Sequence, residues 1–143
     1  MMGDTSFLVG TQWARKDGPI LFVRVAGHVT LEDEKALLRT LEEIKREYGR
    51  CYILFDASAK ASHDPEARGY SAKHYNDSNK PDCVAVFGAT FANRVLVTLF
   101  GRAIKLLARI DLHVEFFSTE AQAREFLLQL DRRSGSGQSS SKP

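Results

Sequence analysis

The chain has 143 residues and a formal net charge of +2, and 43% of its residues are hydrophobic. This length fits one domain with a substantial core, and the composition is that of an ordinary globular protein. The small charge does not demand an anionic partner, and no apolar run reaches the roughly 20 residues that cross a bilayer.

The start of the sequence and the cysteines indicate a reducing compartment. Residues 1–4 lack the positive and apolar regions of a secretory signal. Cys51 and Cys83 each open a predicted buried strand, with no CxxC pattern and no histidine cluster beside them. We therefore expect a cytoplasmic protein with two buried thiols, no metal and no cofactor.

The first third of the chain predicts a hairpin followed by a helix. Two β-like runs, Ser6–Trp13 and Pro19–Val25, are separated by a segment whose Asp-Gly step favours a tight turn. Thr30 then precedes a helical pattern that ends at Gly49, and Asp33 completes an approximate capping box.

The middle of the chain alternates strands with a helix. Cys51–Phe55 and Asp82–Phe87 have the length and composition of strands that are buried on both faces. Between them lies the most polar internal stretch, residues 57–80, which predicts a loop and then a helix over Pro65–Tyr75.

The last third predicts helix, strand and helix. At 100° per residue, Ala92–Arg109 carries its polar side chains on an arc of roughly 100° and its apolar ones over roughly 200°. Asp111–Phe117 predicts a strand nearer the sheet edge, and Ser118 is the expected cap of the last helix. The Ser/Gly-rich residues 133–143 predict a disordered tail, which leaves a domain over 1–132.

The predicted element order is ββαβαβαβα. Strands and helices that alternate in this way imply an α/β domain with a mixed, mostly parallel sheet, an N-terminal β-hairpin and helices packed on the sheet.

Three segments within this order, Phe22–Thr30, Tyr52–Asp56 and Val114–Ala123, carry a resemblance that covers about Pro19 to Leu130. The chain resembles the STAS superfamily, the fold of anti-sigma-factor antagonists and of the cytoplasmic tails of sulphate transporters. It looks closest to the branch that is also related to the CRAL-TRIO lipid carriers. Members of the superfamily act mostly as non-enzymatic switches that bind other proteins, so the resemblance implies a single STAS-like regulatory domain.

The resemblance also implies a candidate regulatory loop. In the antagonist branch, a strand that ends in an acid is followed by an Asp-Ser-Ser-Gly motif whose serine is phosphorylated. Here Asp56 matches the strand-end acid and Asp64 lies near the motif's aspartate, but Pro65 stands where the serine would be. Ser58 and Ser62 are the candidate replacements, because phosphate near a helix N-terminus meets favourable amide dipoles. The alternative is that both hydroxyls satisfy backbone groups of the loop.

The helix over 92–109 is the candidate partner-binding surface. Its apolar arc is wider than one sheet face needs, so the surplus is expected to bind a protein partner or a second copy, with the cations setting orientation. The candidate contact residues are Arg94, Val97, Phe100, Arg102, Ile104, Lys105 and Arg109. The alternative is a carrier, in which the arc lines a pocket for a lipid or small apolar ligand. No recognisable motif or aromatic platform accompanies the cations, which disfavours nucleic acid.

A polar cluster provides the candidate for catalysis. Asp56, His63 and His74 follow a predicted central strand, where open α/β sheets place their ligand sites. Their spacing matches neither paired helical metal ligands nor a nucleophile motif. The sequence therefore predicts a non-enzymatic domain without catalytic residues.

Overall fold

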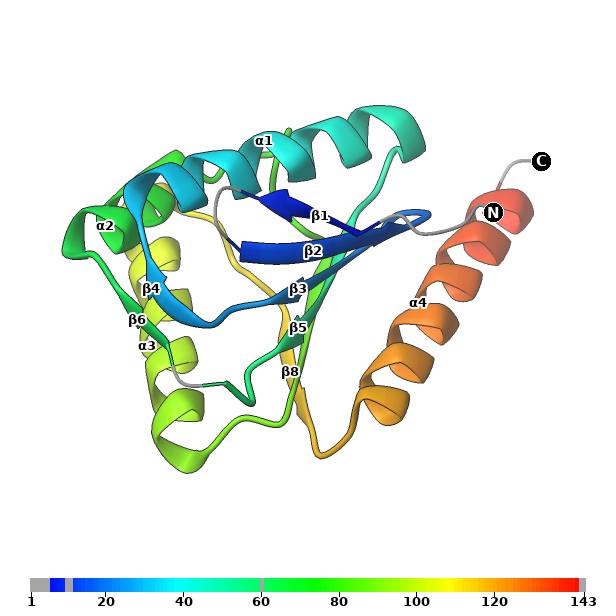
Figure 1. Cartoon of the computed structure of the whole chain (residues 1–143). Coiled ribbons are helices and arrows are strands. Elements are labelled where there is room, and N and C mark those ends of the chain that lie inside the picture. The colour runs from blue at the N-terminus through cyan, green and yellow to red at the C-terminus, as the bar shows by residue number, and fades with distance from the viewer. Residues whose placement is uncertain (1–5, 10–11, 60, 142–143) are drawn as a thin grey trace.

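A computed structural model describes residues 6–9, 12–59 and 61–141 of the chain. Six strands form one sheet in the order β1-β2-β3-β5-β7-β8 (Figure 1). They are β1 (Ser6–Val9), β2 (Gln12–Asp17), β3 (Ile20–Arg24), β5 (Tyr52–Asp56), β7 (Cys83–Phe87) and β8 (Val114–Phe117). Two short strands, β4 (Gly27–Val29) and β6 (Ala61–His63), form a separate parallel pair.

The pairing of the strands confirms the predicted fold class. β1, β2 and β3 are antiparallel neighbours, whereas β3, β5, β7 and β8 are parallel. The prediction of one strand over Ser6–Trp13 is wrong, because β1 and β2 divide that segment and β2 continues to Asp17. Asp17 pairs with Ile20, so the turn contains only two residues, and Gly18 supplies the positive φ of 59° that such a turn favours.

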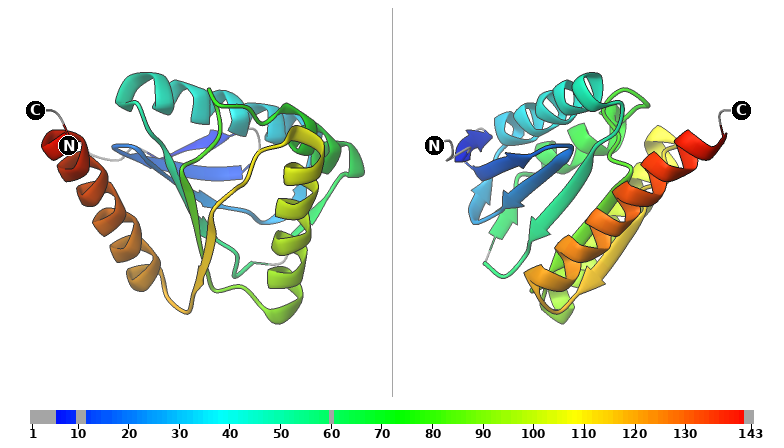
Figure 2. Two further views of the ribbon diagram at one scale, coloured as in Figure 1. Left: turned by 180° about the vertical axis from the view of Figure 1, so that it is seen from behind. Right: turned by 90° about the vertical axis from the view of Figure 1, so that its right-hand side faces the viewer.

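Three helices cover one face of the sheet, and a fourth helix covers the opposite face (Figure 2). The first group is α1 (Leu31–Tyr48), α2 (Pro65–His74) and α3 (Phe91–Ala108), and the opposite face carries α4 (Glu120–Ser141). The predicted capping box of α1 is confirmed: the Asp33 amide donates to Thr30 Oγ1 at 3.2 Å, and the Thr30 amide donates to Asp33 Oδ2 at 2.9 Å. Gly49 ends α1 in the left-handed conformation, at a φ of 77°.

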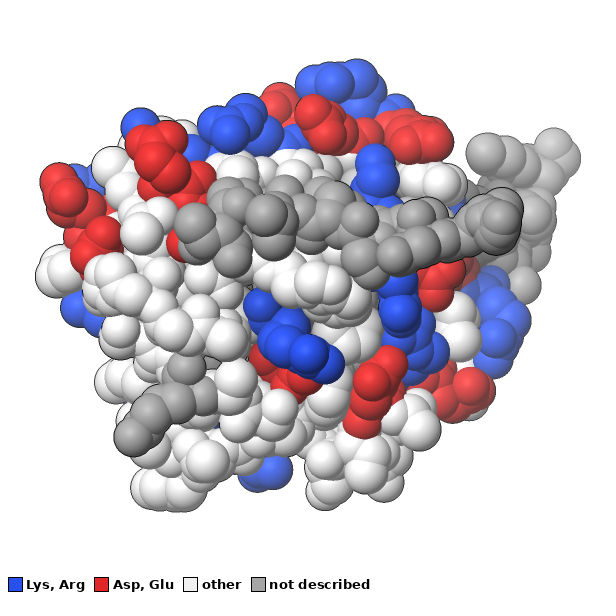
Figure 3. All heavy atoms as spheres, viewed as in Figure 1, with Lys and Arg blue, Asp and Glu red and all other residues white. Residues whose placement is uncertain are grey.

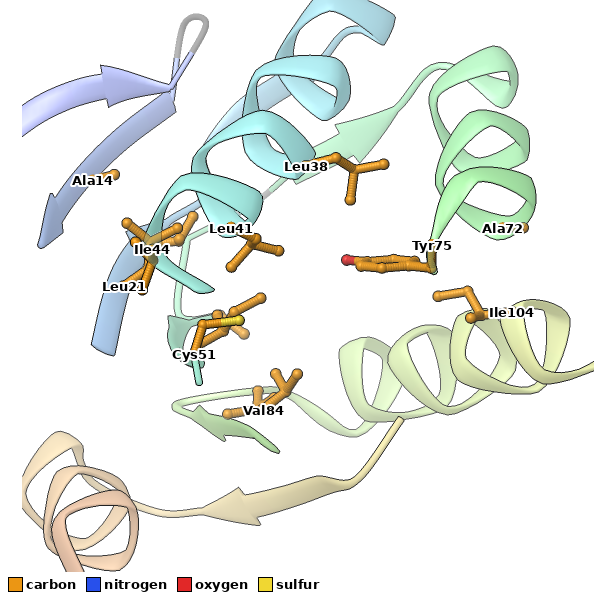
Figure 4. Close-up of a cluster of buried hydrophobic side chains, with 14 residues drawn as sticks. Ala14, Leu21, Leu38, Leu41, Ile44, Cys51, Ala72, Tyr75, Val84 and Ile104 are labelled. Atoms are coloured by element: carbon orange, nitrogen blue, oxygen red, sulfur yellow. The ribbon is translucent and has the colours of Figure 1, made fainter. Parts of the chain in front are cut away.

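Alternating side chains of the central strands divide the core into two clusters. Ile53 of β5 and Val86 of β7 face α1, α2 and α3, where Figure 4 shows Ile104 pointing from α3 toward Tyr75. The larger group on this side also includes Leu21, Val23, Leu38, Leu41, Ile44, Cys51 and Val84. The main core therefore lies between the sheet and the helices α1, α2 and α3.

The second cluster lies beneath α4. Leu54 and Phe87 of the sheet meet Ala123 and Leu127 of α4, both of which are fully buried. At the edge of this cluster, Trp13 meets the ring of Phe22 edge-on at 5.3 Å, and the guanidinium groups of Arg15 and Arg24 lie over the indole. Arginines of β2, β3 and α4 therefore cover the aromatic rings at this edge.

The cap of α4 differs by one residue from the prediction. The Gln122 amide donates to Thr119 Oγ1 at 3.2 Å, so Thr119 rather than Ser118 caps the helix. α4 extends to Ser141. The boundary between a domain over 1–132 and a tail over 133–143 stays a prediction.

Candidate functional site

α3 is attached to the domain along a narrow strip of its surface. Ile104 is fully buried, and Val97 and Phe100 are half-buried against the main core. All three residues were predicted to contact a partner. For Ile104 this prediction is wrong, because its side chain is fully buried within the domain. The reason is the rotation of α3 about its own axis. The side of its apolar arc that carries Val97, Phe100 and Ile104 faces the core, and the middle of the arc does not.

The rest of the apolar arc of α3 faces outward. Within the described residues, six of the eight exposed large apolar side chains lie on this helix. They are Phe91 at 83% exposure, Leu106 at 77%, Leu96 at 58%, Leu107 at 53%, Leu99 at 52% and Val95 at 41%. Figure 3 shows few charged side chains at the lower left of the molecule, where Figure 1 places β4, β6 and α3. Exposed apolar side chains grouped on one helix mark a candidate interaction site.

The cations of α3 form a stripe beside these apolar residues. The Arg94 guanidinium lies 5.5 Å from the ring centre of Phe116, and Lys105 Nζ lies 3.9 Å from Asp111 Oδ2. Arg102 and Arg109 are exposed, and neither forms an ion pair with a described residue. The predicted cationic contacts are therefore all at the surface, and two of them are already engaged within the domain.

Asp56 organises the first half of the loop that follows β5. The carboxylate is only 5% exposed, and its Oδ1 accepts hydrogen bonds from the Ser58 amide at 3.0 Å and from Ser58 Oγ at 2.6 Å. Its Oδ2 accepts from Arg24 Nε at 3.2 Å. Burial acts to raise the pKa of Asp56, but the hydrogen bonds from Ser58 and Arg24 outweigh it and lower the pKa. Asp56 is therefore a charged anchor for the loop.

The second half of the loop contains a Ser–His–Asp arrangement that the sequence reading missed. Pairing of β4 with β6 aligns His28 with Ser62. His28 Nδ1 lies 2.8 Å from Ser62 Oγ, and His28 Nε2 lies 2.6 Å from Asp64 Oδ1. Nucleophilic catalysis also needs a substrate pocket and oxyanion donors. These contacts join β4 to β6 and to Asp64 at the start of α2, and the cavities beside Arg50 and beside Gln12 are not lined by these residues.

The side chains considered for catalysis do not converge. Asp56 binds Ser58 and Arg24, whereas His74 donates to the Tyr70 carbonyl at 2.8 Å and stacks on the Tyr70 ring. No hydrogen bond or ion pair between described residues joins Asp56 to His63 or His74. The described part of the chain also contains no group of three acidic, histidine or cysteine residues placed to hold a metal ion.

The loop after Asp56 and the start of α3 form one continuous surface. Asn93 Nδ2 donates to the Ala57 carbonyl at 3.1 Å. Gly88, with a φ of 74°, lies so close to the loop that an added Cβ would be 3.1 Å from Ser58 Cβ. The loop is therefore in direct contact with the segment that leads into α3.

His63 is expected to make the domain sensitive to mild acid. Burial, followed by the nearby Arg68 and His28, lowers the pKa of His63 from its ordinary 6.5. The unfolded chain therefore binds this proton more tightly, so stability is full above about pH 6.5 and falls as the pH drops toward the folded pKa. Urea denaturation between about pH 8 and about pH 5 should show this loss in the parent protein and much less of it in His63→Gln. An identical loss in both proteins would contradict the assignment.

Comparison with known proteins gives a family. In the described part of the chain, no helix is both long enough and apolar enough to cross a membrane. No curated protein and no solved structure matches the sequence. The family model SpoIIAA-like matches residues 20–128, in agreement with the predicted STAS resemblance. This family has the STAS-type fold of anti-sigma-factor antagonists, fits a regulatory module of that kind, and its domains are generally non-enzymatic. Because the match covers well over half of the sequence, the chain belongs to the SpoIIAA-like family.

Proposed function

We propose that this domain is a non-enzymatic regulatory module that docks a protein partner. The docking surface consists of the outer face of α3 and the loop after Asp56, which Asn93 and Gly88 connect. The observation that carries the proposal is the row of exposed apolar side chains on α3 beside a cationic stripe. Burial of such side chains supplies affinity, and the charges select the partner and its orientation.

The loop is the proposed regulatory part of this surface. Ser58 Oγ donates to Asp56, and Ser62 Oγ contacts His28, whose other ring nitrogen contacts Asp64. A phosphate on either serine would add negative charge beside a carboxylate and replace the existing hydrogen bond. The resulting repulsion would shift the loop against the start of α3, so modification and docking would be coupled.

A carrier of lipids or small apolar ligands receives no comparable support. One cavity of about 260 Å³ includes Arg50, Asp82 and His113 in its lining, and another has a volume of about 30 Å³. Neither is lined by residues of α3. Pockets for apolar ligands are mostly lined by hydrophobic side chains and measure about 300–1,000 Å³.

Photocrosslinking tests the proposed docking surface. A photoreactive amino acid at Leu99, 52% exposed on α3, is expected to capture a discrete protein in the native cell. The matched control is Leu128, 37% exposed on α4, on the opposite face of the sheet. Capture at Leu99 and not at Leu128 supports the proposal, whereas equal capture at both positions, or capture at Leu128 alone, contradicts it.

A further inference from the structure

The exposed apolar side chains of α3 follow the spacing of a two-helix seam. Ala92, Leu96, Leu99, Ala103 and Leu106 are separated by intervals of four, three, four and three residues, and of these Ala103 is partly buried against the main core. This is the alternation with which one helix presents apolar residues to a second helix laid along it. Leu96, Leu99 and Leu106 are each more than half exposed, so the seam is open to a partner.

Cations flank this seam on one side. Arg102 directly precedes the seam position of Ala103, and Arg109, seven residues further on, is the C-terminal cap of α3 in the left-handed conformation at a φ of 61°. The other two cations of the helix are engaged within the domain, Arg94 over Phe116 and Lys105 beside Asp111. α3 itself contains no acidic residue. Two exposed arginines therefore remain available to a partner along the seam.

We propose that the segment docking on α3 is an amphipathic helix with an apolar stripe and acidic side chains facing Arg102 and Arg109. This inference rests on the proposed docking function and specifies the chemistry of the partner. Residues beside a helical seam set partner choice through charge, so carboxylates at the facing positions are the complement of these arginines.

A second copy of the chain lacks this complement. In an antiparallel pair of α3 helices, the arginine side of one copy would face the arginine side of the other, with no acid on either helix. In a parallel pair, that side would face the positions of Phe100 and Leu107, neither of which is acidic, and Phe100 is packed against the core of its own domain. Charge and packing therefore favour a different, acidic chain.

Designed peptides test the inference. The probe is a fluorescently labelled peptide of about 21 residues with a leucine seam flanked by glutamates, and its control carries lysines at the same positions. We expect the acidic peptide to bind the full chain at least about tenfold more tightly than the basic one, measured by fluorescence anisotropy. Arg102→Glu with Arg109→Glu should reverse this preference, whereas Arg102→Lys with Arg109→Lys should keep it. Circular dichroism checks that each variant is folded.

The outcomes separate this inference from the docking function. If Leu99→Asp abolishes binding but both peptides bind equally well, the docking surface stands and the acidic partner is refuted. If the acidic peptide does not bind at about 0.1 mM, the inference is also overturned. Leu99-dependent binding to phosphatidylcholine vesicles with about one quarter phosphatidylglycerol, without peptide binding, would assign the surface to a membrane instead. A dimer at about 0.1 mM that Leu99→Asp dissociates would assign it to a second copy.

Discussion

Ile104→Ala is expected to lower the free energy of unfolding by about 2–5 kcal/mol, because it removes methyl groups from a close-packed core and leaves a cavity. Ile104 is fully buried where α3 meets the main core. Leu99→Ala, one turn and a half along the same helix, should change the free energy of unfolding by less than about 0.5 kcal/mol, because Leu99 faces outward.

The measurement is urea denaturation of the two variants beside the parent protein. A comparable loss in both variants would show that Leu99 is covered within the domain, and the outer face of α3 would then not be free to dock. A large loss for Ile104→Ala alone would support the division of the helix into an attaching strip and an exposed face.

Asp56→Ala is expected to cost about 2–4 kcal/mol of stability, because a buried carboxylate that accepts several hydrogen bonds leaves its donors without partners when it is removed. The donors are the Ser58 amide and hydroxyl and the Arg24 guanidinium. Asp56→Asn keeps an acceptor oxygen for Ser58 and should cost less.

The pH dependence of this difference provides a second measurement. The pKa of Asp56 is lowered in the folded state, so its contribution is present above the unfolded pKa and is lost as the pH falls through the folded pKa. The difference in stability between the parent protein and Asp56→Ala should therefore shrink in acid. A difference that stays constant down to about pH 3 would show that the charge of Asp56 does not stabilise the loop.

The helices and central strands were predictable because their signals are local. Thr30, Asp33 and Gly49 mark both ends of α1 within the segment itself, and the capping box and left-handed cap are confirmed. The apolar runs of β5 and β7 reflect burial on both faces, which needs no knowledge of the neighbouring strands. The predicted cap of α4 was one residue too early, because the hydrogen bond that caps this helix is made by Thr119.

Pairing over long distances was not predictable from these patterns. β4 and β6 contain three residues each, too few for a periodic signal, and their pairing alone brings His28 to Ser62. The arc of α3 was predicted, but its rotation was not, because an apolar arc of roughly 200° allows several strips to face the sheet. Ile104 was therefore assigned to the outside although it lies inside.

The position of Trp13 allows its fluorescence to distinguish binding at α3 from unfolding of the domain. It is the single tryptophan of the chain, and its indole lies between the arginines of β2 and β3 on the α4 face of the sheet. Intrinsic fluorescence therefore reports the integrity of the N-terminal hairpin. Docking on α3, behind the opposite face, should leave the emission spectrum unchanged, whereas loss of the Trp13 environment on unfolding should shift it to longer wavelength.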